Sequence, residues 1–169
     1  IDTIGHTERA YALAMEAFGI PNMSSADFRS LYERNVKTVE YLKHFGIDSK
    51  FVEDFRKRRD DHYVEVLKSK AEWIEDAEDV LYQLHAILPL GLATGAQRQY
   101  IDAIDERLGM LQYIRTVICA DTEGYKRKPD PFLLLQAASS LGVEPQNALY
   151  VGDQFTDVRA AKMANMQSC

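Results

Sequence analysis

The chain has 169 residues, of which 46% are hydrophobic and 27% charged, and these proportions are ordinary for a folded globular protein. Its formal net charge of −6 excludes a global attraction to nucleic acid or to an anionic membrane surface. The sequence shows no apolar run of membrane-spanning length, no signal-peptide pattern and only two cysteines, so we expect a cytoplasmic protein without a disulfide framework.

The first 75 residues predict helices throughout. Apolar residues recur at three- and four-residue spacing in four stretches, which is typical of amphipathic helices. The first stretch ends before Pro21, and Ser24-Ser-Ala-Asp27 resembles a capping box that opens the second. The third stretch stops at Gly46, and the fourth covers about residues 49–70. Four helices with short connections predict a small antiparallel bundle.

Beyond residue 75, helices alternate with short apolar runs. The runs at residues 88–93, 116–120 and 148–151 read as buried strands, and helical patterns separate them. Alternating strands and helices imply a parallel sheet that is covered on both faces. The sequence therefore predicts an α/β core preceded by a helical bundle.

Polar residues follow each expected strand. Thr94-Gly95 offers a hydroxyl and backbone N–H groups near a helix N-terminus, where a phosphate oxygen could bind. Lys128 offers a cation just before a helix, and Asp153 and Asp157 offer carboxylate ligands for a hard cation. The carboxyl ends of parallel strands are where open α/β folds bind their ligands.

Each of these signals also has a structural interpretation. A Thr-Gly pair after a strand is often a helix cap, and Lys128-Pro-Asp-Pro131 could be a turn with a solvated lysine. Asp157 could merely favour a helix N-terminus electrostatically. The order of the three signals along the chain favours the functional interpretation.

The sequence resembles the haloacid dehalogenase-like hydrolases, in particular the phosphoglycolate phosphatase-like subfamily with a helical cap after its first motif. The matching segments are Leu92-Ala-Thr-Gly95 for the second motif of the family, Lys128-Pro-Asp-Pro131 for the third and Val151-Gly-Asp-Gln-Phe-Thr-Asp157 for the fourth. The resemblance implies a three-layer, Rossmann-like core with a parallel sheet at residues 1–4 and 76–169, and an inserted cap at residues 5–75.

The same resemblance implies a magnesium-dependent phosphatase that acts on a small phosphorylated metabolite through an aspartyl-phosphate intermediate. Lys128 and Thr94 would be catalytic, Thr94 and Gly95 would hold phosphate, and Asp153 and Asp157 would serve the metal. In the cap, Arg34 and Lys37 are candidates for substrate recognition. The basic run at residues 56–59 reads instead as a solvated helix face, because Asp60 and Asp61 follow it.

The family's first motif, Asp-x-Asp with its nucleophile, is not in the sequence, and we expect it upstream of Ile1. We also expect the last strands to lie beyond the carboxyl end, so the chain is interpreted as truncated at both ends. In the family, the first strand lies between the strands of the second and fourth motifs, and its loss would leave two strand edges without partners.

Two alternatives stay open. One is a sugar-phosphate mutase of the same fold, and the other is a non-catalytic binding or regulatory protein that lacks the nucleophile. Neither nucleic acid nor a membrane is expected as a partner, and both a monomer and a homodimer are compatible with the sequence.

Overall fold

The computed structural model describes residues 1–34, 36 and 38–169. The chain divides into two compact units, Ile1–Glu72 and Trp73–Cys169, and each has its own hydrophobic core. The division falls close to the boundary expected between residues 75 and 76. Residues 1–4 group with the first unit in this division, whereas the family resemblance placed them with the core, so their domain assignment stays a prediction.

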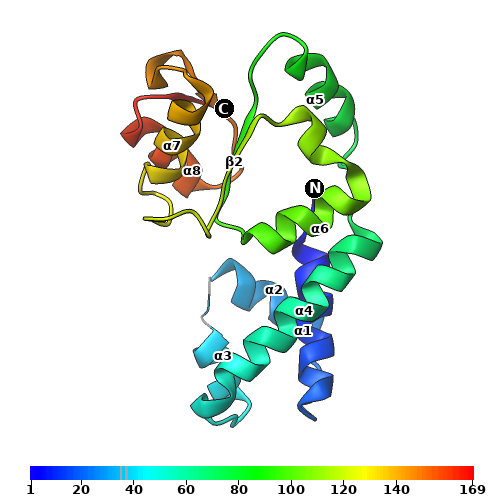
Figure 1. Ribbon diagram of the computed structural model, residues 1–169. Helices are drawn as coiled ribbons and strands as arrows, with labels where there is room; N and C mark the ends of the chain where they lie inside the picture. Colours follow the sequence, from blue (N-terminus) through cyan, green and yellow to red (C-terminus); the bar gives the residue numbers. More distant parts are fainter. Residues whose placement is uncertain (35, 37) are drawn as a thin grey trace. The chain divides into compact units, whose positions relative to one another are not determined.

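The first unit is helical, as the periodicity predicts. Its elements are α1 (Ile4–Ala17), α2 (Ser25–Glu33), α3 (Thr38–His44), the 3-10 turn η1 (Ser49–Phe51) and α4 (Val52–Lys70). Helices α1 and α4 lie side by side, and α3 also contacts α4 (Figure 1). The buried core of the unit is Ala14, Met15, Ile20, Tyr41, Leu42, Val52 and Phe55.

Local sequence signals set the helix ends of this unit. The Ser24 hydroxyl accepts the backbone N–H of Asp27 at 3.2 Å, which confirms the predicted cap of α2. Gly19 and Gly46 have φ angles of +66° and +70°, a left-handed conformation that glycine adopts without a Cβ clash. These caps and turns reverse the chain between helices, so that the apolar faces of the helices meet.

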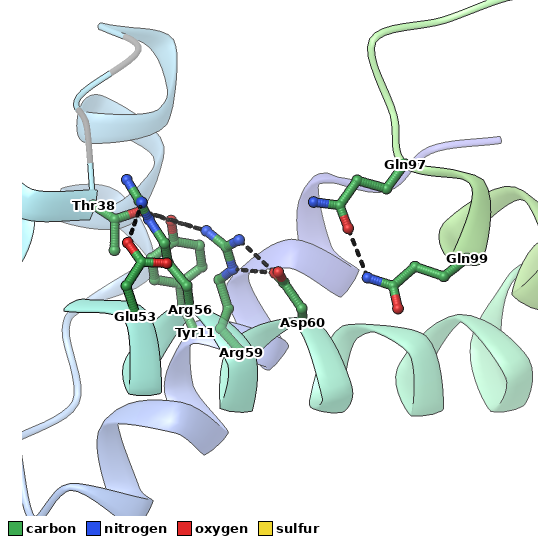
Figure 2. Close-up of polar contacts among 8 residues, drawn as sticks. All are labelled: Tyr11, Thr38, Glu53, Arg56, Arg59, Asp60, Gln97 and Gln99. Atoms are coloured by element: carbon green, nitrogen blue, oxygen red, sulfur yellow. Dashed lines mark hydrogen bonds and ion pairs between the residues drawn. The ribbon is translucent and has the colours of Figure 1, made fainter. Parts of the chain in front are cut away.

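Arg59 of α4 is partly buried where three helices meet (Figure 2). Its Nη1 donates to the Tyr11 hydroxyl of α1 at 3.0 Å and to Thr38 Oγ1, at the start of α3, at 3.4 Å. Its guanidinium also pairs with Asp60, and the two side chains are only 21% and 17% exposed. The interpretation of residues 56–59 as a solvated face is therefore wrong for Arg59, because tertiary partners enclose it.

The second unit carries the strands, with helices on either side of them (Figure 1). Its elements in chain order are α5 (Ala77–His85), β1 (Gly91–Ala93), α6 (Arg98–Leu108), η2 (Met110–Tyr113), β2 (Thr116–Ile118), α7 (Phe132–Leu141), η3 (Pro145–Asn147), β3 (Leu149–Tyr150), α8 (Phe155–Met163) and β4 (Gln167–Ser168). The core of this unit is formed by residues of β1, β2, α7 and α8 together with Ala164 just after α8. Within the described residues, no helix combines the length and the apolar character that crossing a bilayer requires.

The three expected strands are present but shorter than predicted. Pro89 has no N–H to donate, and β1 begins only at Gly91. The second strand ends at Ile118 because Cys119 donates its N–H to the Thr122 hydroxyl at 3.1 Å, which starts a turn. The fourth strand, β4, was not predicted, since Gln167–Ser168 carries no apolar run.

The strands form two separate parallel pairs within the described residues, β1 with β2 and β3 with β4. Leu90 O accepts the N–H of Arg115, and Thr94 N–H donates to Ile118 O, so both residues face the strand β2. Backbone groups of successive residues in a strand point to opposite edges, so those of Ala93 point away from β2. Tyr150 O bonds toward β4, so Leu149 and Val151 turn to the opposite edge of β3. Leu149 and Val151 are 59% and 71% exposed, which is unusual for parallel strands.

Replacement of Arg59 by methionine should destabilise the helical unit. Arg59→Met removes the ion partner of the partly buried Asp60, and we expect a loss of about 2 kcal/mol in the free energy of unfolding. The measurement is urea unfolding of the full-length protein followed by circular dichroism.

Arg56→Met is the matched control on the same helix. Arg56 pairs with Glu53 at 2.7 Å in an exposed site, so its loss should cost less than about 0.5 kcal/mol. Equal losses for the two variants would show that the contacts of Arg59 contribute no more than a surface ion pair.

Candidate active site

Thr94 directly follows β1 and is held by two backbone contacts. Its N–H donates to Ile118 O at 2.9 Å, and its Oγ1 accepts the N–H of Ala96 at 3.1 Å. These bonds leave the hydroxyl proton of Thr94 available to donate to a ligand. A Cβ at Gly95 would lie 3.3 Å from the Tyr125 hydroxyl, so the backbone there passes close to a side chain.

Lys128 lies in the loop before α7, and its ammonium is held on two sides. Its Nζ is 2.5 Å from Asp157 Oδ1 and 3.0 Å from the Tyr150 hydroxyl, and the side chain is 19% exposed. Burial lowers the pKa of Lys128, but Asp157 and Tyr150 outweigh that effect, so the net shift of the pKa is upward. Lys128 is therefore a fixed cation at neutral pH, not a solvated lysine in a turn.

Asp157 lies in the first turn of α8 and is buried, with its side chain 5% exposed. Its Oδ2 accepts the N–H of Gln154 at 3.1 Å, as part of a capping box. Its Oδ1 has no hydrogen bond of good geometry among the described residues, although the Lys128 ammonium is close. Asp157 thus stabilises the N-terminus of α8, as one interpretation held, and it also pairs with Lys128, which was not predicted.

Asp153 is exposed in the loop between β3 and α8. Mg²⁺ is usually bound by one or two carboxylates, with water and substrate phosphate completing its shell, so an exposed carboxylate at this position fits one ligand of that set. The described residues contain no cluster of three or more His, Cys, Asp or Glu side chains that could hold a metal alone. The assignment of Asp153 and Asp157 to a metal site stays a prediction.

Tyr150 links the three predicted segments, and the sequence analysis missed it. Its hydroxyl donates to Ala93 O at the end of β1 at 3.1 Å and accepts from Lys128 Nζ. Contacts therefore run without a break from Ala93, beside Thr94, through Tyr150 and Lys128 to Asp157. This places the second, third and fourth motif segments at one site.

The structure says less about Arg34 and Lys37, the two residues of the cap that were predicted to contact the substrate. Arg34 is the C-terminal cap residue of α2, is exposed, and donates its Nε–H to Ser30 O at 3.2 Å. Lys37 lies outside the described residues. Their predicted contact with substrate remains a prediction.

Known proteins resemble this chain both in sequence and in fold. The "Phosphoglycolate phosphatase" of Salmonella typhi is 37% identical over 114 residues, which cover 67% of this chain and 45% of that protein. The protein of the same name from Escherichia coli (strain K12) is 36% identical over 115 residues, again 67% and 45% of the two chains. The chain therefore spans less than half the length of these curated relatives.

Solved structures agree on the fold. A putative phosphoglycolate phosphatase from Lactobacillus plantarum superposes with a TM-score of 0.78 at 23% identity, covering 99% of this chain and 78% of that one. A β-phosphoglucomutase from Clostridium difficile superposes with a TM-score of 0.74 at 20% identity, covering 99% and 77%. At these identities the likeness concerns the fold alone, and it confirms the predicted Rossmann-like α/β architecture.

The family profile described as "Haloacid dehalogenase-like hydrolase" matches residues 1–169. Together with the curated relatives and the order of Thr94, Lys128 and Asp153 along the chain, this match confirms the resemblance drawn from the motifs. The chain belongs to the haloacid dehalogenase-like hydrolases.

Proposed function

We propose that this chain supplies most of the active site of a magnesium-dependent phosphatase that acts on a small phosphate ester. The observation that carries the proposal is the placement of Lys128, whose ammonium is held by Asp157 and Tyr150 at the ends of β1 and β3. Phosphoryl transfer needs fixed positive charge near the transferring group, since its catalysis is mostly positioning and electrostatic stabilisation.

Two side chains of the chain would contact the phosphoryl group. An ammonium has three N–H donors; one goes to the Tyr150 hydroxyl and the ion pair with Asp157 Oδ1 occupies no more than one, so Lys128 retains at least one for a phosphate oxygen. The Thr94 hydroxyl, whose oxygen already accepts from Ala96, would donate its proton to a second oxygen. Gly95 would bring backbone N–H close to the same group.

Asp153 would hold the magnesium ion, since its carboxylate is exposed. Asp157 would support the site by fixing Lys128, because both of its oxygens already face partners within the chain. When bound, the ion offsets the repulsion between a carboxylate nucleophile and the phosphate.

The nucleophile would be an aspartate upstream of Ile1 that forms an aspartyl-phosphate, which water then hydrolyses. The two strand edges support this part of the proposal. Ala93 of β1 and Leu149 of β3 turn backbone groups away from their paired strands. Ala93 O already accepts the Tyr150 hydroxyl, but its second lone pair and the other groups of the two edges could bond to a further parallel strand.

The proposed substrate class is a small phosphorylated metabolite. Phosphoglycolate is the first compound to test, because the curated relatives carry that enzyme name. Arg34 and Lys37 are proposed to contact the part of the substrate that is not transferred. A cytoplasmic location and a monomeric or homodimeric state remain predictions.

Gly152 has a steric role in the proposed site. A Cβ at this position would lie 2.6 Å from both Cβ and Oδ2 of Asp157, closer than a side chain tolerates. Any larger residue there must displace Asp157 or the loop that carries Asp153. The glycine of the fourth motif therefore makes room for the carboxylate that pairs with Lys128.

Asp153→Asn should lower kcat/KM for p-nitrophenyl phosphate and for phosphoglycolate by about 100-fold or more, and it should raise the Mg²⁺ concentration needed for half-maximal rate. The amide keeps the size of the side chain but removes the negative charge that would bind the cation. The assay uses the protein encoded in full, including any residues ahead of Ile1, and ³¹P NMR identifies the products.

Asp102→Asn is the matched control, because Asp102 forms an exposed ion pair with Arg98 on α6. It should leave both kinetic parameters within about twofold of the wild type, as expected for a surface pair. An Asp153→Asn variant as active as the control would contradict the assignment of Asp153 to the metal site.

The same assay separates the alternative functions. Transfer of phosphate between sugar hydroxyls without its release would favour the mutase, and absence of any turnover would favour the non-catalytic protein.

Gly152→Ala should lower kcat/KM by about 10- to 100-fold, because it forces Asp157 away from Lys128. Gly5→Ala is the control, since a Cβ at Gly5 within α1 meets open space and alanine favours the helix. Thermal unfolding of both variants separates a lost site from a lost fold. A folded Gly152→Ala variant with wild-type kinetics would contradict the steric argument.

A further inference from the structure

Tyr150 is a half-buried phenol whose two hydrogen bonds have a defined direction. Its hydroxyl proton goes to Ala93 O at 3.1 Å, so its oxygen is left to accept from Lys128 Nζ at 3.0 Å. The ammonium lies beyond the hydroxyl end of the ring, with Nζ 5.5 Å from the ring centroid. Tyr150 therefore contacts Lys128 through its hydroxyl and connects it to the end of β1.

The two partners differ in how firmly the backbone holds them. Lys128 lies in a loop and reaches the site through a long flexible side chain, whose rotamer freedom opposes a single position. Tyr150 lies in β3, and its own carbonyl accepts Cys169 N–H at 3.0 Å in the pairing with β4. The strand thus fixes the ring, and the ring restricts the ammonium.

Asp157 alone would not fix the lysine in the same way. A single carboxylate oxygen, Oδ1, lies close to Nζ, and that contact lacks the geometry of an aligned hydrogen bond. The Tyr150 hydroxyl is a second partner of Nζ, and its contact has the geometry of a hydrogen bond. The ion pair with Asp157 and the hydrogen bond to Tyr150 together restrict the ammonium, and at least one N–H of Lys128 is left for a ligand.

We propose that Tyr150 is a positioning residue for Lys128, which aims the free N–H of the ammonium at the phosphoryl oxygen and holds the end of β1 in register with the end of β3. The inference rests on the proposed phosphatase function for its kinetic consequence but not for its structural one. Nothing in it requires Tyr150 to touch the substrate, so it is not a catalytic residue.

The kinetic test is Tyr150→Phe in the full-length protein, which removes the hydroxyl and keeps the ring. We expect kcat for the phosphate ester to fall by about 10-fold or more, with KM within about twofold of the wild type. The reason is that a misplaced Lys128 ammonium would stabilise the transition state less, while substrate binding would change little. Tyr113→Phe is the matched control: its hydroxyl also makes a side-chain hydrogen bond, to Glu78 at 3.1 Å, outside the site. It should leave kcat unchanged.

A double-mutant cycle tests whether Tyr150 acts through Lys128. The probe is orthovanadate, and its dissociation constant is measured by calorimetry in the wild type, Tyr150→Phe, Lys128→Met and the double variant. If Tyr150 acts through Lys128, then Tyr150→Phe weakens binding in the wild type and adds nothing in the Lys128→Met background. Additive losses would overturn the proposal.

A spectroscopic test does not depend on activity. The ammonium resonance of Lys128, assigned by its disappearance in Lys128→Met, should shift or broaden in Tyr150→Phe and stay in place in Tyr113→Phe. An unmoved resonance in a folded Tyr150→Phe variant would refute the positioning role. A shifted resonance in a protein that neither hydrolyses phosphate esters nor binds orthovanadate would uphold the positioning role and reject the phosphatase.

Discussion

The ion pair between the half-buried Lys128 and the buried Asp157 is the constraint on which the rest of the site depends. Taking an ammonium and a carboxylate out of water is costly, and a pair of this kind is tolerated only where further polar groups help to satisfy it. Here the help comes from Gln154 N–H on Asp157 and from the Tyr150 hydroxyl on Lys128. The loop before α7, the start of α8 and the end of β3 must therefore be placed together.

The sequence predicts the parts of this arrangement that repeat at short range. Helical periodicity located the helices, Ser24 marked a helix start, and the order of Thr94, Lys128 and Asp153 after apolar runs indicated a ligand site at the strand ends. These features depend on neighbours within a few residues. In the structure, contacts of Ala93, Tyr150, Lys128 and Asp157 connect the same three segments.

Long-range contacts were not readable from local patterns. The charges that follow Arg59 made it look solvated, yet Tyr11 and Thr38, far away in the sequence, enclose it. Tyr150 counted as one more apolar residue of a strand, because the pattern does not show where its hydroxyl points. Both errors have one cause: a side chain with an apolar body and a polar end is classified by its sequence neighbours, whereas its partners come from other elements.

The side-chain contacts of the site and the backbone pairing of the strands are separate structural requirements. The contacts of Lys128, Tyr150 and Asp157 are side-chain contacts around strand ends, and they form although β1 and β3 belong to different two-stranded sheets. By contrast, the apolar side chains of Leu149 and Val151 near the end of β3 remain exposed. The Tyr150 hydroxyl bonds to both Ala93 O and Lys128, so it connects the polar contacts of the site with a strand end. Changes there should disturb the chemistry before the fold, whereas changes at the strand edges should disturb the fold first.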